Sequence, residues 1–203
     1  MQNFTYIKIV YILFFILILG VACTIPYYFE SPSMYYKTGI DKFLLRSGKI
    51  LGISATILIF YQLVFVSRFT TLEKVFKIKN LFQSHRTNGL IILAAAVLHP
   101  IFILGADHFV FFPFESKYWP EITGIVLLSI LALFVLISHW QQKLKLDYKL
   151  WRLLHKSFAP IIIIVLYIHI INVSKTFESG TPFYAVTFIF FLSLILIVRK
   201  YLK

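Results

Sequence analysis

The sequence predicts an all-α, polytopic membrane protein, a bundle of six transmembrane helices with both termini in the cytoplasm. Three observations predict this fold class. Sixty per cent of the 203 residues are apolar and 14% are charged, and the mean hydropathy is +0.85, which is too apolar for a water-soluble globule. The apolar residues form long uninterrupted blocks, and the basic residues gather in alternate connections between these blocks.

Each apolar block is long enough to cross the hydrocarbon core of a bilayer, which is about 30 Å thick and takes about 20 helical residues. The blocks cover residues 9–26, 48–67, 87–105, 122–139, 156–174 and 182–199. The first is expected to be an uncleaved anchor, because it runs long and bulky residues (Pro26, Tyr27 and Tyr28) follow it. Since the six helices fill the chain, we expect a single domain, residues 1–203, with no soluble nucleotide or flavin domain.

The charges of the connections predict the orientation. Fourteen of the 20 Lys and Arg, but only two of the eight acids, fall in four segments expected on one side: residues 1–8, 68–86, 140–156 and 199–203. Because Lys and Arg are retained on the cytoplasmic side, this side is expected to face the cytoplasm across the cell inner (plasma) membrane. The same bias accounts for the whole net charge of +12, so we expect the lipid bilayer, and no nucleic acid, as the partner of these bases.

The connections themselves are expected to be loops. Two aromatic loops, residues 27–49 and 105–120, are expected outside, and two basic loops, residues 69–84 and 141–154, inside. The third transmembrane helix is therefore expected to begin at residue 85, and the fifth at residue 155.

Four histidines form two equally spaced pairs. His85 and His99 lie on the third apolar segment, His155 and His169 lie on the fifth, and 14 positions separate the members of each pair. In an α-helix, 14 positions return a side chain to within about 40° of its first direction and advance it by about 21 Å. Both helices run in the same direction, so we expect His85 to face His155, and His99 to face His169 about 21 Å further out.

Two imidazoles on facing helices supply both axial ligands of a haem iron. Ionisable groups inside a bilayer are costly and normally face the bundle interior, where they serve a site. We therefore predict two b-type haems, with iron held by the pairs His85/His155 and His99/His169, and no catalytic residue. An iron with two imidazole ligands has no open position for a substrate, which suits electron transfer.

Small residues share the helix faces of these histidines. Gly89 and Ala159 each follow a histidine by four positions, and Ala96 lies one turn before the second histidine of its helix. Such residues leave room for a porphyrin, but they equally let transmembrane helices approach closely. Arg86 and Arg152, beside the inner pair, fit propionate binding and cytoplasmic anchoring equally well.

Two motifs resemble the ferric reductase-like transmembrane domain. The segment HRTNG at 85–89 leads to LHP at 98–100, and WRLLH at 151–155 leads to His169. The family includes ferric-chelate reductases and the membrane core of NADPH oxidases, and the resemblance covers the second to sixth helices. It implies a cytochrome b-like oxidoreductase component, in which a cytoplasmic reduced flavin donates electrons through paired haems to ferric iron, dioxygen or an extracytoplasmic redox partner protein.

The chain departs from this family in one respect. Its relatives usually continue after the sixth helix into a flavin and nicotinamide domain, so the flavin is expected on a partner, such as a cytoplasmic flavin reductase, or on a missing domain. A shorter relative is the haem-binding membrane subunit of the bacterial periplasmic methionine sulfoxide reductase system, which matches in length and helix count but tends to carry arginine in place of His85. A quinol-linked cytochrome b subunit is a further alternative.

A histidine-dependent ion transporter is the alternative of a different class. Transport of ions through a bundle calls for Asp or Glu inside it to share the ion's charge. All eight acids, however, fall in connections or at the ends of the expected helices. A purely structural subunit is disfavoured by the two equal histidine pairs. His108 and His139 lack matching partners and are expected at the surface.

Overall fold

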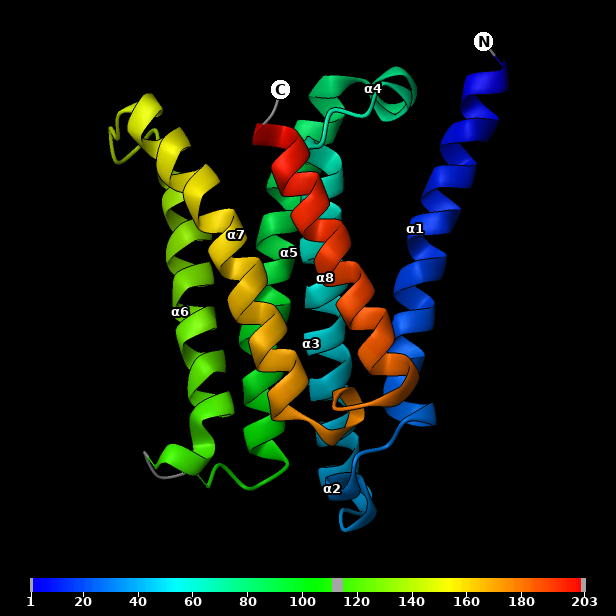
Figure 1. Cartoon of the computed structure of the whole chain (residues 1–203), viewed down its shortest axis with the longest axis vertical. Helices are drawn as coiled ribbons and strands as arrows, with labels where there is room; N and C mark the ends of the chain where they lie inside the picture. Colours follow the sequence, from blue (N-terminus) through cyan, green and yellow to red (C-terminus); the bar gives the residue numbers. More distant parts are fainter. Residues whose placement is uncertain (1, 111–114, 202–203) are drawn as a thin grey trace.

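Six long helices, each long and apolar enough to cross a membrane, make up the bundle in the part of the chain that the structure describes (Figure 1). The computed structural model describes residues 2–110 and 115–201. The long helices are α1 (Gln2–Tyr28), α3 (Gly39–Val66), α5 (Ile78–Gly105), α6 (Trp119–Trp140), α7 (Tyr148–Val173) and α8 (Gly180–Tyr201). The prediction of an all-α multi-pass membrane protein with six spans is confirmed.

The short elements mark the two ends of the bundle. Both chain termini, the helix α4 (Thr70–Phe76) and the α6–α7 connection lie at one end, which we call the terminal end (Figure 1). The helix α2 (Pro32–Tyr35) lies at the opposite end, called here the α2 end, with the α5–α6 and α7–α8 connections. Those two connections contain the 3₁₀ turns η1 (Ser116–Tyr118) and η2 (Lys175–Phe177).

All six long helices begin before the apolar blocks that the sequence predicts, and α3, α5 and α7 do so by the most. α3 begins at Gly39, inside the predicted loop 27–49, and α4 and the start of α5 replace most of the predicted loop 69–84. α7 begins at Tyr148, so His85 and His155 each lie seven positions after the first residue of their helix rather than at its start. The physical reason is that backbone groups near the headgroups are best satisfied inside a helix, while long polar side chains reach out to water. Hydropathy alone does not detect such turns.

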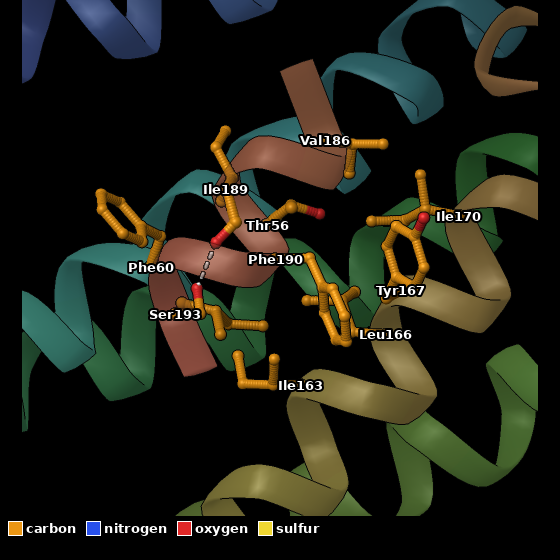
Figure 2. Close-up of a pocket in the computed structure, with 11 residues that line it drawn as sticks. Thr56, Phe60, Ile163, Leu166, Tyr167, Ile170, Val186, Ile189, Phe190 and Ser193 are labelled. Carbon is orange, nitrogen blue, oxygen red and sulfur yellow. Dashed lines mark hydrogen bonds between the residues drawn. The ribbon is translucent and has the colours of Figure 1, made fainter. Parts of the chain in front are cut away.

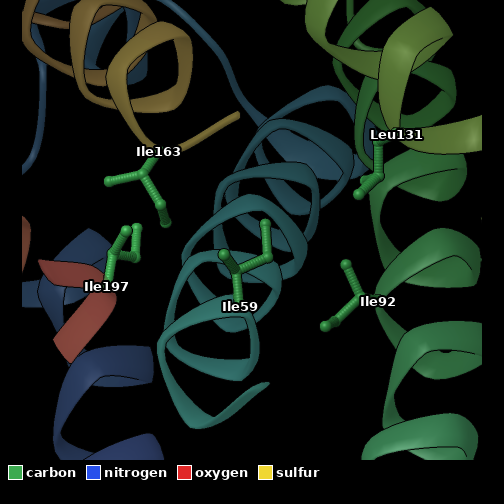
Figure 3. Close-up of a cluster of buried hydrophobic side chains, with 5 residues drawn as sticks. All are labelled: Ile59, Ile92, Leu131, Ile163 and Ile197. Atoms are coloured by element: carbon green, nitrogen blue, oxygen red, sulfur yellow. The ribbon is translucent and has the colours of Figure 1, made fainter. Parts of the chain in front are cut away.

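α3 lies at the centre of the bundle. It packs along much of α5 and also contacts α1 and α8, while α7 packs against α6 and α8. Halfway along the bundle, one side chain from each of five helices meets in a buried core (Figure 3): Ile59, Ile92, Leu131, Ile163 and Ile197. Close packing of this kind, rather than exclusion of water, holds helices together in lipid.

The two helices that carry the paired histidines do not pack backbone against backbone. Along their described lengths, α5 and α7 share no extensive close approach, and α6 contacts both of them. The two helices run in the same direction, as the sequence predicts (Figure 1). Side chains on their facing sides therefore meet across a wider spacing than at the α3–α5 contact.

Candidate functional site

The inner pair of histidines meets near the terminal end of the bundle. The ring centres of His85 and His155 are 6.1 Å apart, and their planes make an angle of 78°. Because a metal–imidazole bond is about 2 Å long, two imidazoles on opposite sides of one metal place their ring centres about 6 Å apart. The spacing of this pair is therefore compatible with two axial ligands of one iron.

Neighbouring side chains hold the His155 ring in place. Its ring centre lies 5.7 Å from that of Phe134 of α6 and 5.2 Å from that of Trp151, and both rings stack with it. Its Nδ1 lies 3.2 Å from Ser138 Oγ, which also accepts a hydrogen bond from Trp151 Nε1. By contrast, His85 Nδ1 is buried without a hydrogen-bond partner among the described residues. A buried polar atom of this kind is destabilising by about 1–3 kcal/mol, so this ring gains from a bound partner.

The outer pair is fixed by backbone carbonyl groups of neighbouring helices. His99 Nδ1 lies 2.8 Å from the carbonyl oxygen of Gly48 in α3, and His169 Nδ1 lies 2.9 Å from that of Pro120 in α6. A carbonyl oxygen only accepts, so Nδ1 of each ring carries the proton and donates it. The lone pair of each neutral ring is therefore on Nε2. Metal-binding histidines are typically held in this way, with the second ring nitrogen donating to a carbonyl or carboxylate.

Two glycines on neighbouring helices leave the space that the outer histidine rings occupy. A Cβ added at Gly52 of α3 would lie 2.9 Å from His99 Nδ1, and one added at Gly124 of α6 would lie 2.6 Å from His169 Cε1. Real Cβ atoms essentially never come within 3.0 Å of such neighbours, so both rings sit directly against the backbone of the neighbouring helix. The two imidazoles, their Nδ1–H tautomer and the space left by the glycines all fit ligands of a haem iron.

The sequence reasoning did not single out these glycines or the two carbonyl groups. One signal was present, because Gly48 and Gly52 form the pattern G-x-x-x-G, which is typical of close helix contact in membranes. Gly48 makes such a contact, since a Cβ there would lie 2.8 Å from Ile103 Cδ1 of α5. Gly124 stands alone in α6, and no pattern in the sequence indicates that it faces His169.

The small residues that the sequence did single out lie elsewhere. A Cβ added at Gly89 would lie 3.2 Å from Gln62 Nε2 of α3, and Ala96 packs against the central isoleucine core. These contacts support the interpretation that Gly89 and Ala96 let helices pack closely. Ala159 is half-buried. Arg86 and Arg152 are exposed.

The two unpaired histidines lie at the surface. His108 is exposed, with Nε2 3.5 Å from Asp41 Oδ2, and His139 is exposed beside Trp140. All eight acids lie in connections, in α4 or at the ends of the apolar helices. In the described ranges, no three His, Cys, Asp or Glu side chains form a group that could hold a metal ion.

A small pocket lies between α3, α7 and α8 (Figure 2). Its volume is about 20 Å³, room for about one water molecule. Two of its hydroxyl groups have their own partners: Tyr167 Oη lies 3.0 Å from Thr187 Oγ1, and Ser193 Oγ donates to the carbonyl oxygen of Ile189. This pocket is far too small for a porphyrin.

Comparison with known proteins identifies the family of the chain. The family model described as ferric reductase like transmembrane component matches residues 51–166, more than half of the chain. The matched stretch contains His85, His99 and His155 and ends three positions before His169. Neither the curated proteins nor the solved structures that were compared with the chain gave a match. The chain belongs to the ferric reductase-like transmembrane component family, whose members typically bind haem and whose role is electron transfer in the membrane.

Proposed function

We propose that this protein carries electrons across the cell inner membrane through two b-type haems, one held by His85 and His155 and the other by His99 and His169. The observation that carries the proposal is the outer pair, in which each Nδ1 donates to a backbone carbonyl and each Nε2 keeps its lone pair. A bound haem supplies one-electron redox chemistry. Since electron transfer needs no acid, base or nucleophile, the task of this chain is to bind, orient and insulate.

Each part of the site has a share in that task. The carbonyl groups of Gly48 and Pro120 fix the tautomer of the outer rings, and the aromatic neighbours fix the ring of His155. The aliphatic core between the two levels, with Ile92 and Ile163 at its centre, excludes water. A hydrophobic surrounding of this kind helps to set the redox potential of a metal centre.

The charge distribution supports a direction for the electrons. The basic segments belong to the terminal end, and the positive-inside rule supports a cytoplasmic position for that end. His85 and His155 would then hold the haem nearer a reduced flavin on a cytoplasmic partner or domain, and His99 and His169 the haem nearer the acceptor. Ferric iron, dioxygen and an extracytoplasmic redox partner protein are the candidate acceptors. Because His85, His99, His155 and His169 would all be used to hold the haems, an acceptor would be reduced at the edge of the site.

The position of His85 favours this proposal over its nearest alternative. The ring lies 6.1 Å from His155, within the bundle, and so favours the four-histidine type over the membrane subunit of the methionine sulfoxide reductase system. The location of all acids outside the interior of the spans also favours electron transfer over ion transport.

A haem assay on the purified protein tests the proposal. We expect two non-covalent haems per chain in the wild type, with about one lost in His99→Ala and about one lost in His155→Ala. The physical reason is that each substitution removes one of the two histidines that would hold a haem. The measurement is the haem-to-protein ratio, together with the reduced-minus-oxidised absorption spectrum.

Two other histidines of the chain provide matched controls. His108→Ala and His139→Ala remove exposed imidazoles and are expected to keep both haems. A colourless wild-type protein from haem-replete cells would reject the proposal. Bound zinc in place of iron would favour the transport alternative.

A further inference from the structure

Three of the four paired histidines have a hydrogen-bond partner at Nδ1, and the fourth does not. His99 and His169 each meet a backbone carbonyl oxygen. Nδ1 of His155 lies 3.2 Å from Ser138 Oγ. Nδ1 of His85, by contrast, is buried without a partner among the described residues. Because metal-binding histidines almost always donate the second ring N–H to an acceptor, His85 lacks a feature that its role requires.

A second buried atom without a partner belongs to Gln62 of α3. Its side-chain oxygen, Oε1, is buried and has no hydrogen-bond partner in the described ranges. An amide oxygen only accepts hydrogen bonds, and a buried acceptor that receives none is destabilising. A protonated Nδ1 of His85 is a donor that lacks an acceptor. The two atoms therefore have complementary needs.

Gln62 and His85 lie opposite each other where α3 packs against α5. The two helices run in opposite directions, and α3 packs along much of α5 (Figure 1). The carbonyl group of Gly48 in α3 contacts His99 in α5. Moving 14 positions along each helix from this contact leads to Gln62 and to His85. Because both moves advance by about 21 Å and return to nearly the same helix face, the second pair meets as the first pair does.

Two contacts support this register. The ring of His85 lies near the backbone carbonyl group of Gln62, although no hydrogen bond from Nδ1 forms there. A Cβ added at Gly89 would lie 3.2 Å from Nε2 of Gln62. Since Gly89 follows His85 by four positions, both share one face of α5, and the amide of Gln62 reaches that face. The absence of a side chain at Gly89 leaves space for this amide.

We propose that Gln62 is the positioning residue of His85, whose Nδ1–H donates to the side-chain oxygen of Gln62. A neutral imidazole carries one N–H and one lone pair, so an acceptor at Nδ1 keeps the lone pair on Nε2, where it is available to a haem iron. The role toward the haem rests on the proposed function, whereas the hydrogen bond needs only the two side chains. Because hydrogen bonding around the ligands helps to set the potential of a haem, Gln62 would also tune the inner one.

A redox titration of the full chain with both haems bound tests this role. Gln62→Leu removes the acceptor, and a ring that no longer donates is a less basic ligand. We therefore expect binding of ferric relative to ferrous haem at the inner pair to weaken roughly tenfold. For a one-electron couple, this raises the potential of the inner haem by about 59 mV. The outer haem is the internal reference and is expected to keep its potential.

Two further variants separate the hydrogen bond from the shape of the side chain. Gln62→Met, an unbranched apolar residue that adapts to irregular space, is expected to give the same rise, so the test does not depend on the folding of one variant. Gln62→Glu keeps an acceptor oxygen at the same reach. It is expected to hold the inner potential at or below the wild-type value, because a carboxylate accepts hydrogen bonds more strongly than an amide.

Asn88→Ala is the matched control. Asn88 of α5 is a second buried amide between α3 and α5, and its Nδ2 donates to the carbonyl oxygen of Leu58 at 2.9 Å. Its loss weakens the same helix contact without removing a partner of His85. We expect a lower unfolding temperature and an unchanged inner potential.

The tautomer of His85 in haem-free protein separates this inference from the proposed function. In ¹⁵N NMR of histidine-labelled apoprotein in nanodiscs, we expect the proton on Nδ1 in the wild type and a loss of this preference in Gln62→Leu. A wild type that shows this tautomer and its loss but binds no haem supports the inference and overturns the proposed function. A wild type with two haems whose inner potential ignores Gln62→Leu overturns only the inference.

Three other results would also overturn the inference. A rise of the inner potential in Gln62→Glu as large as that in Gln62→Leu would show that the acceptor oxygen has no effect. An equal shift in Asn88→Ala would assign the effect to helix packing. A proton on Nε2 of His85 in the wild-type apoprotein would place the lone pair on the wrong nitrogen.

Discussion

At the scale of single residues, the outer histidines are oriented by backbone carbonyl groups and glycines, which have no reactive side chain. The carbonyl groups of Gly48 and Pro120 decide which ring nitrogen keeps its lone pair, and Gly52 and Gly124 decide where the rings lie. The histidines themselves were predictable, because equal spacing on two co-directional helices is visible in one dimension. The carbonyl groups and glycines that orient them were not predictable, because each belongs to a neighbouring helix whose rotation relative to the histidine is set only by packing.

This support leads to a prediction for the two glycines. Gly52→Ala and Gly124→Ala are expected to weaken haem binding at the outer pair by roughly 10- to 100-fold, the usual effect of disturbing the groups that orient a metal ligand. Gly124→Ala is expected to have the larger effect, since its Cβ would lie 2.6 Å from the ring against 2.9 Å for Gly52. Haem titration of the apoprotein measures it. Gly20→Ala, with open space around its Cα, is the control, and an equal loss there would contradict the prediction.

At the scale of helices, the apolar blocks were predictable in number, order and direction, because lipid leaves a spanning chain little choice but helix. Their ends were not. Residues 39–48, 78–84 and 148–154 each contain at least one Lys or Arg among apolar side chains, and they are helical although they precede the apolar blocks. The sequence also did not show which helices pack together. Its histidines pair α5 with α7, whereas the most extensive packing joins α5 to α3.

The central core gives a prediction about stability. Ile92 is 2% exposed and meets side chains from four other helices. Ile92→Ala is expected to lower the free energy of unfolding by about 2 kcal/mol, the lower end of the usual range for a core isoleucine, because lipid rather than water surrounds the separated helices. Thermal unfolding in detergent measures this effect. Ile125→Ala, on α6 and 48% exposed, is the matched control and is expected to change little; equal losses in both variants would argue against a packed core.

At the scale of the whole molecule, the fold brings together basic segments that are far apart in sequence. The N-terminus, α4, the α6–α7 connection and the C-terminus share one end of the bundle (Figure 1), as the alternation of charge predicts. This agreement follows from an even number of spans, and it could be foreseen without any knowledge of packing. The contact of Arg46 with Tyr27 and Glu30 at the α2 end could not, because it depends on how the end of α1 meets α3.

Labelling of single cysteines tests the proposed orientation. In a Cys23→Ser background, Lys175→Cys at the α2 end is expected to react with a membrane-impermeant maleimide in intact cells. Lys143→Cys, in the α6–α7 connection, is expected to react only after the membrane is permeabilised. Both positions are exposed, so accessibility differs only by the side of the membrane. The reverse labelling pattern would contradict the proposed orientation and reverse the proposed direction of electron transfer.

The light packing between α5 and α7 has a consequence for assembly. The α3–α5 pair and the α6–α7 pair are each closely packed, but fewer contacts join one pair to the other. A haem held by both His85 and His155 would link the α3–α5 pair to the α6–α7 pair. A ligand that binds only the folded state stabilises that state. Maturation of this protein would then follow the supply of cofactor, and in cells starved of haem quality-control proteases would remove a larger share of the chains.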